Sequence, residues 1–391
     1  NRYVTQYSLD LLKPVNPAVA LVGTSQRNWT DSGCVGATNC VANDWIPQGD
    51  PLNPAANGEL GAAPNNTFGN YQSVLRFDES WTKGYGNRPY NWEANVGIEH
   101  QLVPNVSVGA SYFRRWYGNL LAKVNMAVQP SDYQSYCITS PVDSRLPGGG
   151  GQQICGFYDL IPSKFGQSDV VETNSSNLGK NLENWNGVDL TMNARLSALN
   201  LQGGLSTGKT MTDNCDIYDK QAGRALVPPS LLGTDLNALG VISTVARDYC
   251  HLETPWLTQV KFVGSYRLPW QDLQLSGTMQ SSPGSAFNAN YAVPNAVVAA
   301  SLGRNPNQAL SANLVPPGSM FNKRVNQVDL KVTKGIALGG TRNLKAAIGL
   351  YNAFNTAAVL GVNNTYNATV WQRPSSILSA RFLKFEGQLN F

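Results

Sequence analysis

The chain has 391 residues, of which only 14% are charged, and a formal net charge of +4. Soluble domains carry roughly 25% charged residues, so part of this surface is expected to face something other than water. No apolar run approaches the roughly 18 residues of a membrane-spanning helix, and the mean hydropathy is -0.24. The basic residues form no cluster, which argues against a nucleic-acid partner. A β-barrel accommodates these observations, because only alternate residues of its strands face lipid.

The amino-terminal part, residues 1–90, is predicted to contain a first strand near residues 3–12 and then a long extracellular loop. The loop is rich in Pro, Gly and Asn, which favour turns over regular elements. A small hairpin is expected within it, near residues 71–81. Neither a starting Met nor a leader segment is present, so Asn1 is expected to be a processed end or the start of a fragment.

The remainder, residues 91–391, is predicted to hold four hairpins and a terminal strand. Apolar and polar residues alternate along residues 92–102 and again along 106–112, with a short turn between. This period of two indicates strands with one apolar face, and two such runs around a short turn predict a hairpin. Three further hairpins follow the same pattern, at residues 188–205, 260–279 and 328–350, and the last of these is expected to turn across residues 335–342.

The final strand is predicted to start near Ile377 and to end at Phe391. Its apolar residues alternate with polar ones, and the four that form a barrel-assembly signal are Leu383, Phe385, Leu389 and Phe391. An aromatic carboxyl-terminal residue resembles the signal by which outer-membrane barrels are recognised for insertion. The barrel-assembly machinery is therefore an expected partner.

The connections between strands alternate between turns of a few residues and loops of about 25 to 60 residues, the layout of outer-membrane barrels. The sequence thus predicts an all-β, antiparallel transmembrane barrel with about ten strands in this chain. The short turns and the carboxyl terminus are expected to be periplasmic, and the long loops extracellular. Five tryptophans near the ends of predicted strands would suit interfacial girdles, namely Trp92, Trp116, Trp185, Trp256 and Trp270.

The six cysteines fall into three couples, each within one polar loop: Cys34 and Cys40, Cys137 and Cys155, and Cys215 and Cys250. Couples of this kind favour local disulfides in an oxidising compartment over free thiols. The loops are therefore predicted to be closed by disulfides outside the cell.

The polar face of the predicted strands carries twelve charged residues, which are candidates for lining a lumen because lipid cannot solvate them. They are Glu93, Glu99, Arg115, Asp189, Arg195, Lys261, Arg267, Asp329, Lys331, Lys345, Lys384 and Glu386. Such charges could line a path for a ligand, or they could pair and only stabilise the wall.

Other motifs give no catalytic, cofactor or metal site. Residues 203–210 match the phosphate-loop pattern, but a strand pattern runs through them and no helical pattern follows. The four glycines at 148–151 indicate a flexible turn. The two histidines, His100 and His251, lie far apart in the sequence and lack further ligands at zinc-site spacing. Carboxylate couples such as Asp44 with Asp50, or Asp213 with Asp216, could hold calcium, although a solvated polar loop is the simpler interpretation.

The chain resembles the TonB-dependent receptors, in particular the Oar-like barrels with a carboxypeptidase-regulatory-like domain. The resemblance lies in residues 88–93, 112–118, 145–156 and 350–355, and in the terminal strand. It implies an outer-membrane location, a barrel of about 22 strands and a plug that TonB moves to admit a nutrient ligand.

The chain departs from that family in having no recognisable plug, TonB box or regulatory-like domain, and ten strands are under half of the implied wall. It is therefore expected to be the carboxyl-terminal portion of a longer receptor, or else a reduced relative. TonB would be a partner only through amino-terminal sequence. The alternatives are an adhesive surface protein anchored by its barrel and a secreted β-sandwich lectin; an enzyme is not expected.

Overall fold

The computed structural model describes residues 2–4, 21, 23, 27–31, 40–53, 55–61, 69 and 75–391, the last range with gaps at 166, 227–245, 270–271, 308 and 341. Among these residues, no helix has the length and apolar character needed to cross a membrane. Of the first predicted strand, Arg2–Val4 is a strand, and residues 5–12 lie outside the described residues. The small hairpin expected near 71–81 is wrong where the structure describes it: Arg76–Phe77 pairs in parallel with Val170–Asn174, and Glu79–Thr82 is helical, while residues 71–74 lie outside the described residues.

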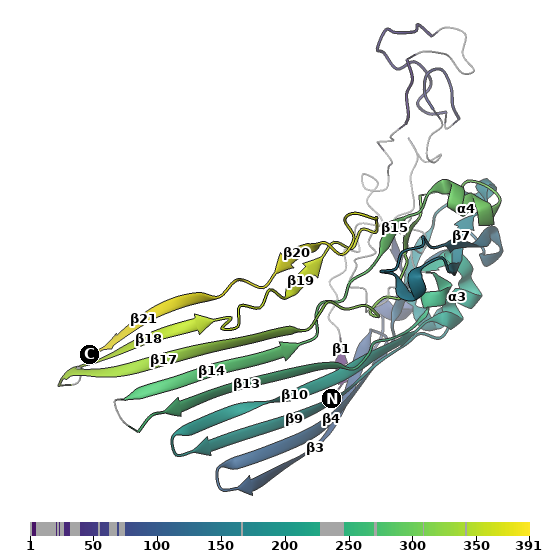
Figure 1. The fold of residues 1–391 in the computed structure, drawn as a ribbon. Helices are drawn as coiled ribbons and strands as arrows, with labels where there is room; N and C mark the ends of the chain where they lie inside the picture. The colour runs from purple at the N-terminus through teal and green to yellow at the C-terminus, as the bar shows by residue number, and fades with distance from the viewer. Residues whose placement is uncertain are drawn as a thin grey trace.

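One large antiparallel sheet dominates the chain (Figure 1). Its strands follow one another across the sheet in the order β1 (Arg2–Val4), β3 (Tyr90–Val103), β4 (Val106–Gly118), β9 (Leu182–Leu196), β10 (Leu199–Asp213), β13 (Leu257–Arg267), β14 (Leu273–Ser282), β17 (Val325–Gly339), β18 (Arg342–Tyr351) and β21 (Phe382–Asn390). A short strand, β12 (His251–Glu253), also pairs with β10. In the described part of the chain β1 and β21 are not paired with each other, so the sheet is open.

The four predicted hairpins and the terminal strand are confirmed, since each hairpin forms an antiparallel pair and β21 pairs with β18. The hairpin turns and the carboxyl terminus lie at one end of the sheet, the turn end (Figure 1). The long connections lie at the opposite end, the loop end. The expected alternation of short and long connections is therefore present.

Two predicted boundaries are wrong. The last strand begins at Phe382, because Ile377 belongs to β20 (Pro374–Ile377), which pairs with β19 (Val359–Val362). The fourth hairpin turns only after Gly339, which pairs with Arg342, so the expected turn residue Gly335 lies inside β17. Gly339 and Gly340 have positive φ angles of 95° and 60°, and this conformation lets the chain reverse in a tight turn.

The long loops contain further short elements. Strands in them are β2 (Arg76–Phe77), β5 (Leu121–Asn125), β6 (Tyr133–Thr139), β7 (Gln153–Leu160), β8 (Val170–Asn174), β11 (Ala225–Leu226), β15 (Asn290–Ala292) and β16 (Ser311–Asn313). The α-helices are α2 (Glu79–Thr82), α3 (Cys215–Gln221) and α4 (Asn295–Leu302). Single 3-10 turns are η2 (Pro130–Asp132), η3 (Pro147–Gly149), η4 (Pro162–Lys164), η5 (Ser175–Asn177), η6 (Ala222–Arg224) and η8 (Arg247–Tyr249).

Four long loops, residues 119–181, 214–256, 283–324 and 352–381, fold together into what we call the loop cap. Their apolar residues share one buried core, to which each loop contributes; examples are Phe157, Leu252, Val298 and Trp371. A second, smaller core lies between the first two loops and includes Val124 and Ile217. In Figure 1, β7, α3 and α4 gather at the loop end of the sheet. The loops are thus a folded part of the protein, with the core that the sheet itself lacks.

Candidate functional site

The polar face of the sheet carries all twelve charged residues that the sequence indicated as lumen-lining. Across β3 and β4, Glu93 lies opposite Arg115, and one strand further Ser111 lies opposite Asp189. The same register continues to β21, where Glu386 lies opposite Ala347. The set, placed on this face by strand pairing, is Glu93, Glu99, Arg115, Asp189, Arg195, Lys261, Arg267, Asp329, Lys331, Lys345, Lys384 and Glu386.

Several of these charges are paired. Arg115 forms an ion pair with Glu93 on the neighbouring strand. Glu386 accepts from two lysines, Lys331 on β17 and Lys384 on its own strand, where the Nζ–Oε1 distance is 3.1 Å. Opposite charges on one polar face can stabilise the wall, as the sequence analysis allowed.

Two hollows lie along the polar face. The smaller, of about 380 Å³, lies near the turn end and is lined by charged residues that include Arg267, Lys331, Lys345 and Glu386. The larger, of about 740 Å³, is lined by residues of β3, β4, β9, β10 and β13, with Glu99, Asp189 and Lys261 as its charged groups. Mixed charge next to open hollows gives this face the capacity to hold water and polar solutes.

The opposite face of the sheet is apolar and exposed. Its residues meet in continuous cross-strand rows, such as Leu330 opposite Leu350 and Leu350 opposite Leu383. Ile98 is 72% exposed and Phe385 is 73% exposed. Large exposed apolar surfaces mark contact with another apolar phase, and a row of this length suits lipid. The assembly-signal residues Leu383, Phe385 and Leu389 lie on this face.

The tryptophans suit the predicted girdle only in part. Trp92 and Trp116 lie opposite each other on the apolar face, each 39% exposed, as a girdle requires. Trp185 was wrongly assigned, because it pairs with Arg115 and therefore shares the polar face. A Cβ added at Gly187 would lie 2.1 Å from the Trp185 ring, so this glycine leaves the space that the ring fills. Trp270 lies outside the described residues.

The loop cap contains a cross-loop cluster centred on Trp371. The Arg145 guanidinium lies 5.2 Å from the Trp371 ring centroid and binds Asp143 at an Nη2–Oδ2 distance of 2.6 Å. Tyr366 donates its hydroxyl to the same carboxylate over 3.2 Å. These bonds from Arg145, then the one from Tyr366, hold the pKa of Asp143 at about 2, well below its usual range. The cluster fixes one loop against another.

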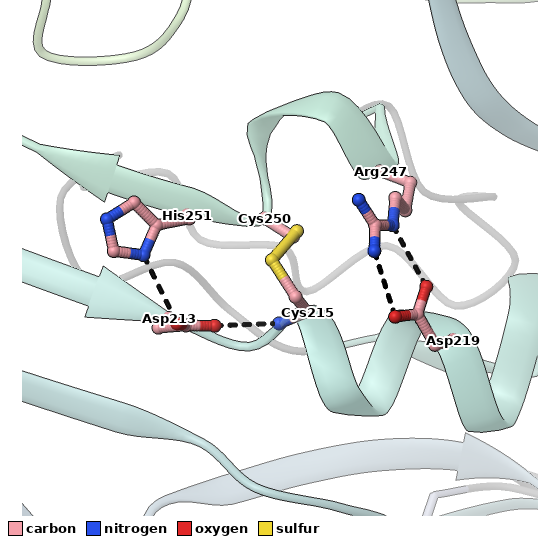
Figure 2. Close-up of a disulfide and its surroundings, with 6 residues drawn as sticks. All are labelled: Asp213, Cys215, Asp219, Arg247, Cys250 and His251. Atoms are coloured by element: carbon pink, nitrogen blue, oxygen red, sulfur yellow. Dashed lines mark hydrogen bonds and ion pairs between the residues drawn. A yellow bond between two sulfur atoms is a disulfide. The ribbon is translucent and has the colours of Figure 1, made fainter.

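Two of the predicted disulfides are present, Cys137–Cys155 and Cys215–Cys250. Cys40 is disulfide-bonded as well, while its predicted partner Cys34 lies outside the described residues. Figure 2 shows that Cys215–Cys250 ties the start of α3 to the chain before β12, with Arg247 bound to Asp219 beside it. Cys137–Cys155 and Cys215–Cys250 therefore each close a segment of the loop cap.

The remaining motifs have structural explanations. Residues 203–210 lie wholly within β10, so the phosphate-loop match is an extended strand. The expectation that no helix follows is wrong, because α3 begins at Cys215, but only after β10 has run on to Asp213. Lys209 pairs instead with Glu253 and lies 5.8 Å from the Trp256 ring centroid. The glycines at 148–151 all have positive φ angles and form a tight turn. His251 contacts the carboxylate of Asp213, with an Nδ1–Oδ2 distance of 3.2 Å (Figure 2).

One cluster was missed by sequence reasoning. The sequence paired Asp44 with Asp50, whereas the structure brings Asp44 together with Asp31 and Glu59, with one carboxylate oxygen of each within 4.8 Å of the others. No local spacing signals this cluster, because its members are 13 and 15 residues apart and are joined only by the fold of the loop.

The geometry defines the class of protein: an antiparallel transmembrane β-barrel wall, with one lipid-type face, one polar face and disulfide-closed loops at one end. A scan against protein-family models found no match, and a sequence search of curated proteins found none. Among solved structures, the chain is similar to the FrpB iron transporter from Neisseria meningitidis, F3-3 variant, with 12% identity and a TM-score of 0.38 over 81% of this chain and 32% of that chain.

A second similar structure is the outer membrane transporter YddB from Escherichia coli, with 10% identity and a TM-score of 0.38 over 77% of this chain and 32% of that one. The chain thus spans about a third of the length of each protein.

Proposed function

We propose that this chain forms the wall and the extracellular cap of an outer-membrane receptor of the TonB-dependent, Oar-like type, and that the cap binds a nutrient ligand for uptake. The observation that carries the proposal is the segregation of the sheet: twelve charged residues share one face with two hollows, and the other face is exposed and apolar. Charges on the inner side of a barrel wall are solvated by a lumen.

In this proposal the cap selects the ligand and the polar face guides it. A cap with its own buried core presents a fixed surface to the ligand. Binding to such a surface costs less conformational entropy than binding to flexible loops, which would have to be ordered first. The hollow of about 740 Å³ carries both signs of charge, which suits a polar solute better than an apolar one. The lipid-facing rows anchor the wall, and the loop end faces outside the cell.

Accessibility of engineered cysteines in native outer membranes tests the two faces. Lys261→Cys lies on the polar face and Val260→Cys, its neighbour, lies on the apolar face. All five cysteines of the described residues are already disulfide-bonded, so they should not react. A water-soluble, membrane-impermeant maleimide is expected to label Lys261→Cys and not Val260→Cys. Equal labelling of both positions would contradict the assignment of lumen and lipid faces.

An adhesive surface protein is the second candidate, because a disulfide-closed cap could bind a partner while the barrel only anchors it. Co-isolation separates the two functions. The full native protein, extracted from outer membranes, should retain the periplasmic domain of TonB on an affinity column if it is an energised receptor. Absence of retention, with the protein folded and heat-modifiable, would favour the adhesive function.

A further inference from the structure

We infer that the loop of residues 27–61 contains a calcium-binding site formed by Asp31, Asp44 and Glu59. This site goes beyond the proposed transport function and does not depend on it. One carboxylate oxygen of each residue lies within 4.8 Å of one from each of the others. Three negative charges at this separation repel one another, and a divalent cation between them removes the repulsion.

The burial of Glu59 points to a ligand. Glu59 is only 4% exposed. Oε2 accepts hydrogen bonds from Trp29 Nε1 and from the Gln48 backbone amide, both over 3.2 Å. Oε1 has no hydrogen-bond partner among the described residues. Burial removes water from a carboxylate oxygen, and this costs free energy unless a hydrogen bond or a bound cation replaces the water.

Backbone amides hold the other two carboxylates in place. Asp31 accepts from the amides of Asn43 over 2.7 Å and Trp45 over 2.8 Å. Both donors have positive φ angles, 64° and 60°. Asp44 accepts at Oδ1 from the backbone amide of Ile46 over 2.9 Å, and at Oδ2 from the side-chain amide of Gln48 over 2.5 Å. These bonds use single lone pairs and leave other lone pairs of each carboxylate available to a metal.

No cationic side chain neutralises the cluster within the described part of the loop. The nearest candidate by sequence, Arg27, donates instead to the carbonyl groups of Gly61, Asn53 and Ala55, each over 2.8 Å. Among the ion pairs of the described residues, none involves the three carboxylates. A cation from solution therefore fits the charge of the site.

The ligand chemistry selects calcium. All three ligands are carboxylate oxygens, with neither imidazole nor thiolate in the cluster, and such sets prefer hard cations. Calcium accepts irregular sets of six to eight oxygen ligands, completed by carbonyl groups and water. Magnesium demands a near-ideal octahedron, which a site assembled from three separated loop segments is poorly suited to provide.

Terbium luminescence tests the site in the full native protein in detergent. Terbium replaces calcium at carboxylate sites, and Trp29 and Trp45, with ring centroids 6.5 Å apart, lie beside the cluster as sensitisers. After treatment with a chelator, the protein is expected to bind terbium with tryptophan-sensitised emission, and calcium should displace it at concentrations at which magnesium does not. Absence of sensitised binding, or displacement by both ions alike, would overturn the proposal.

Matched variants locate the site. Asp31→Asn and Glu59→Gln keep the shape of each side chain and should weaken calcium about tenfold or more, because affinity follows the number of charged ligands. Asp50→Asn is the control, since Asp50 lies in the same loop and caps the Leu52 amide outside the cluster. Protease digestion of the loop without metal checks the fold of each variant. If Asp31→Asn or Glu59→Gln is digested faster than the native protein, Asp44→Asn is used in its place. Unchanged affinity in folded variants would refute the site.

Discussion

Lys331 on β17 and Glu386 on β21 form an ion pair across the intervening strand β18, on the polar face of the sheet. The two residues of β18 beneath this pair are small: Gly349 lies opposite Lys331, and Ala347 lies opposite Glu386. Pairing on the polar face therefore spans three strands and not only neighbouring ones.

Loss of Glu386 should cost more stability than loss of Lys331. Glu386→Gln removes the partner of two lysines, Lys331 and Lys384, whereas Lys331→Met leaves the Glu386–Lys384 pair intact. Both side chains of the Lys331 pair are roughly a third exposed, at 39% and 32%, so the loss of one pair is expected to cost little stability and the loss of both pairs somewhat more. Urea unfolding in detergent micelles measures the difference. A larger loss in Lys331→Met would contradict this account.

Arginine substitutions should distinguish the two faces of one strand. Met279, on β14, lies between Phe262 and Val328 on the apolar face and is 45% exposed. Its neighbour Thr278 faces the other side and donates to Asp329 over 3.4 Å. We expect Met279→Arg to destabilise the folded barrel in lipid by about 2 kcal/mol, because the charge would lie in hydrocarbon.

Thr278→Arg is the matched control and should change stability by less than about 0.5 kcal/mol, since Asp329 can pair with the new charge. Unfolding in phospholipid vesicles measures both variants. If the two cost the same, the apolar face does not contact lipid.

The strands and their faces could be predicted because alternation is a local property of sequence. Along β3, Val96 and Ile98 alternate with polar positions such as Glu99. The structure places the two apolar residues on one face of the sheet and Glu99 on the other, as expected. Ends of strands were less predictable. Gly335 is a residue typical of turns, yet β17 continues through it and pairs it with Lys345. The absence of a side chain there leaves room for Asp272, whose Oδ2 lies 1.9 Å from where a Cβ would be. Such a contact between distant residues leaves no local signal.

The loop cap could not be predicted from local pattern. Its core joins residues from four loops, and side chains such as Phe157 and Trp371 meet only after the sheet has brought the loops together. The same holds for Asp31, Asp44 and Glu59. The two cysteine couples were predictable because each lies within one loop, where chain closure is short.

Removal of the Cys215–Cys250 disulfide should loosen the cap and leave the sheet intact. The bond closes a separation of 35 residues, and loss of a constraint of this size costs about 3 to 4 kcal/mol of local stability. The double variant Cys215→Ser with Cys250→Ser avoids a free thiol. Limited proteolysis is expected to cut the 214–256 loop faster, with unchanged heat-modifiability of the barrel. Equal proteolysis of variant and native protein would show that the bond does not hold this loop.

Acidification should weaken the cap through Asp143, whose pKa is lowered to about 2 by the bonds from Arg145. The unfolded carboxyl group has a pKa of about 3.9, so ionised Asp143 stabilises the folded cap above that pH. This contribution is lost as the pH falls from about 4 toward about 2.

The matched variant Asp143→Asn retains the size of the side chain and lacks the titrating group. Because it loses the charge-assisted bonds to Arg145, the variant should be less stable than the native protein at neutral pH. The gap should narrow as the pH falls through the range from about 4 to about 2, since protonation then removes the same bonds from the native protein. Denaturant unfolding of the cap, followed by tryptophan fluorescence at several pH values, measures the gap. A gap that stays constant across this range would show that Asp143 does not contribute through its charge.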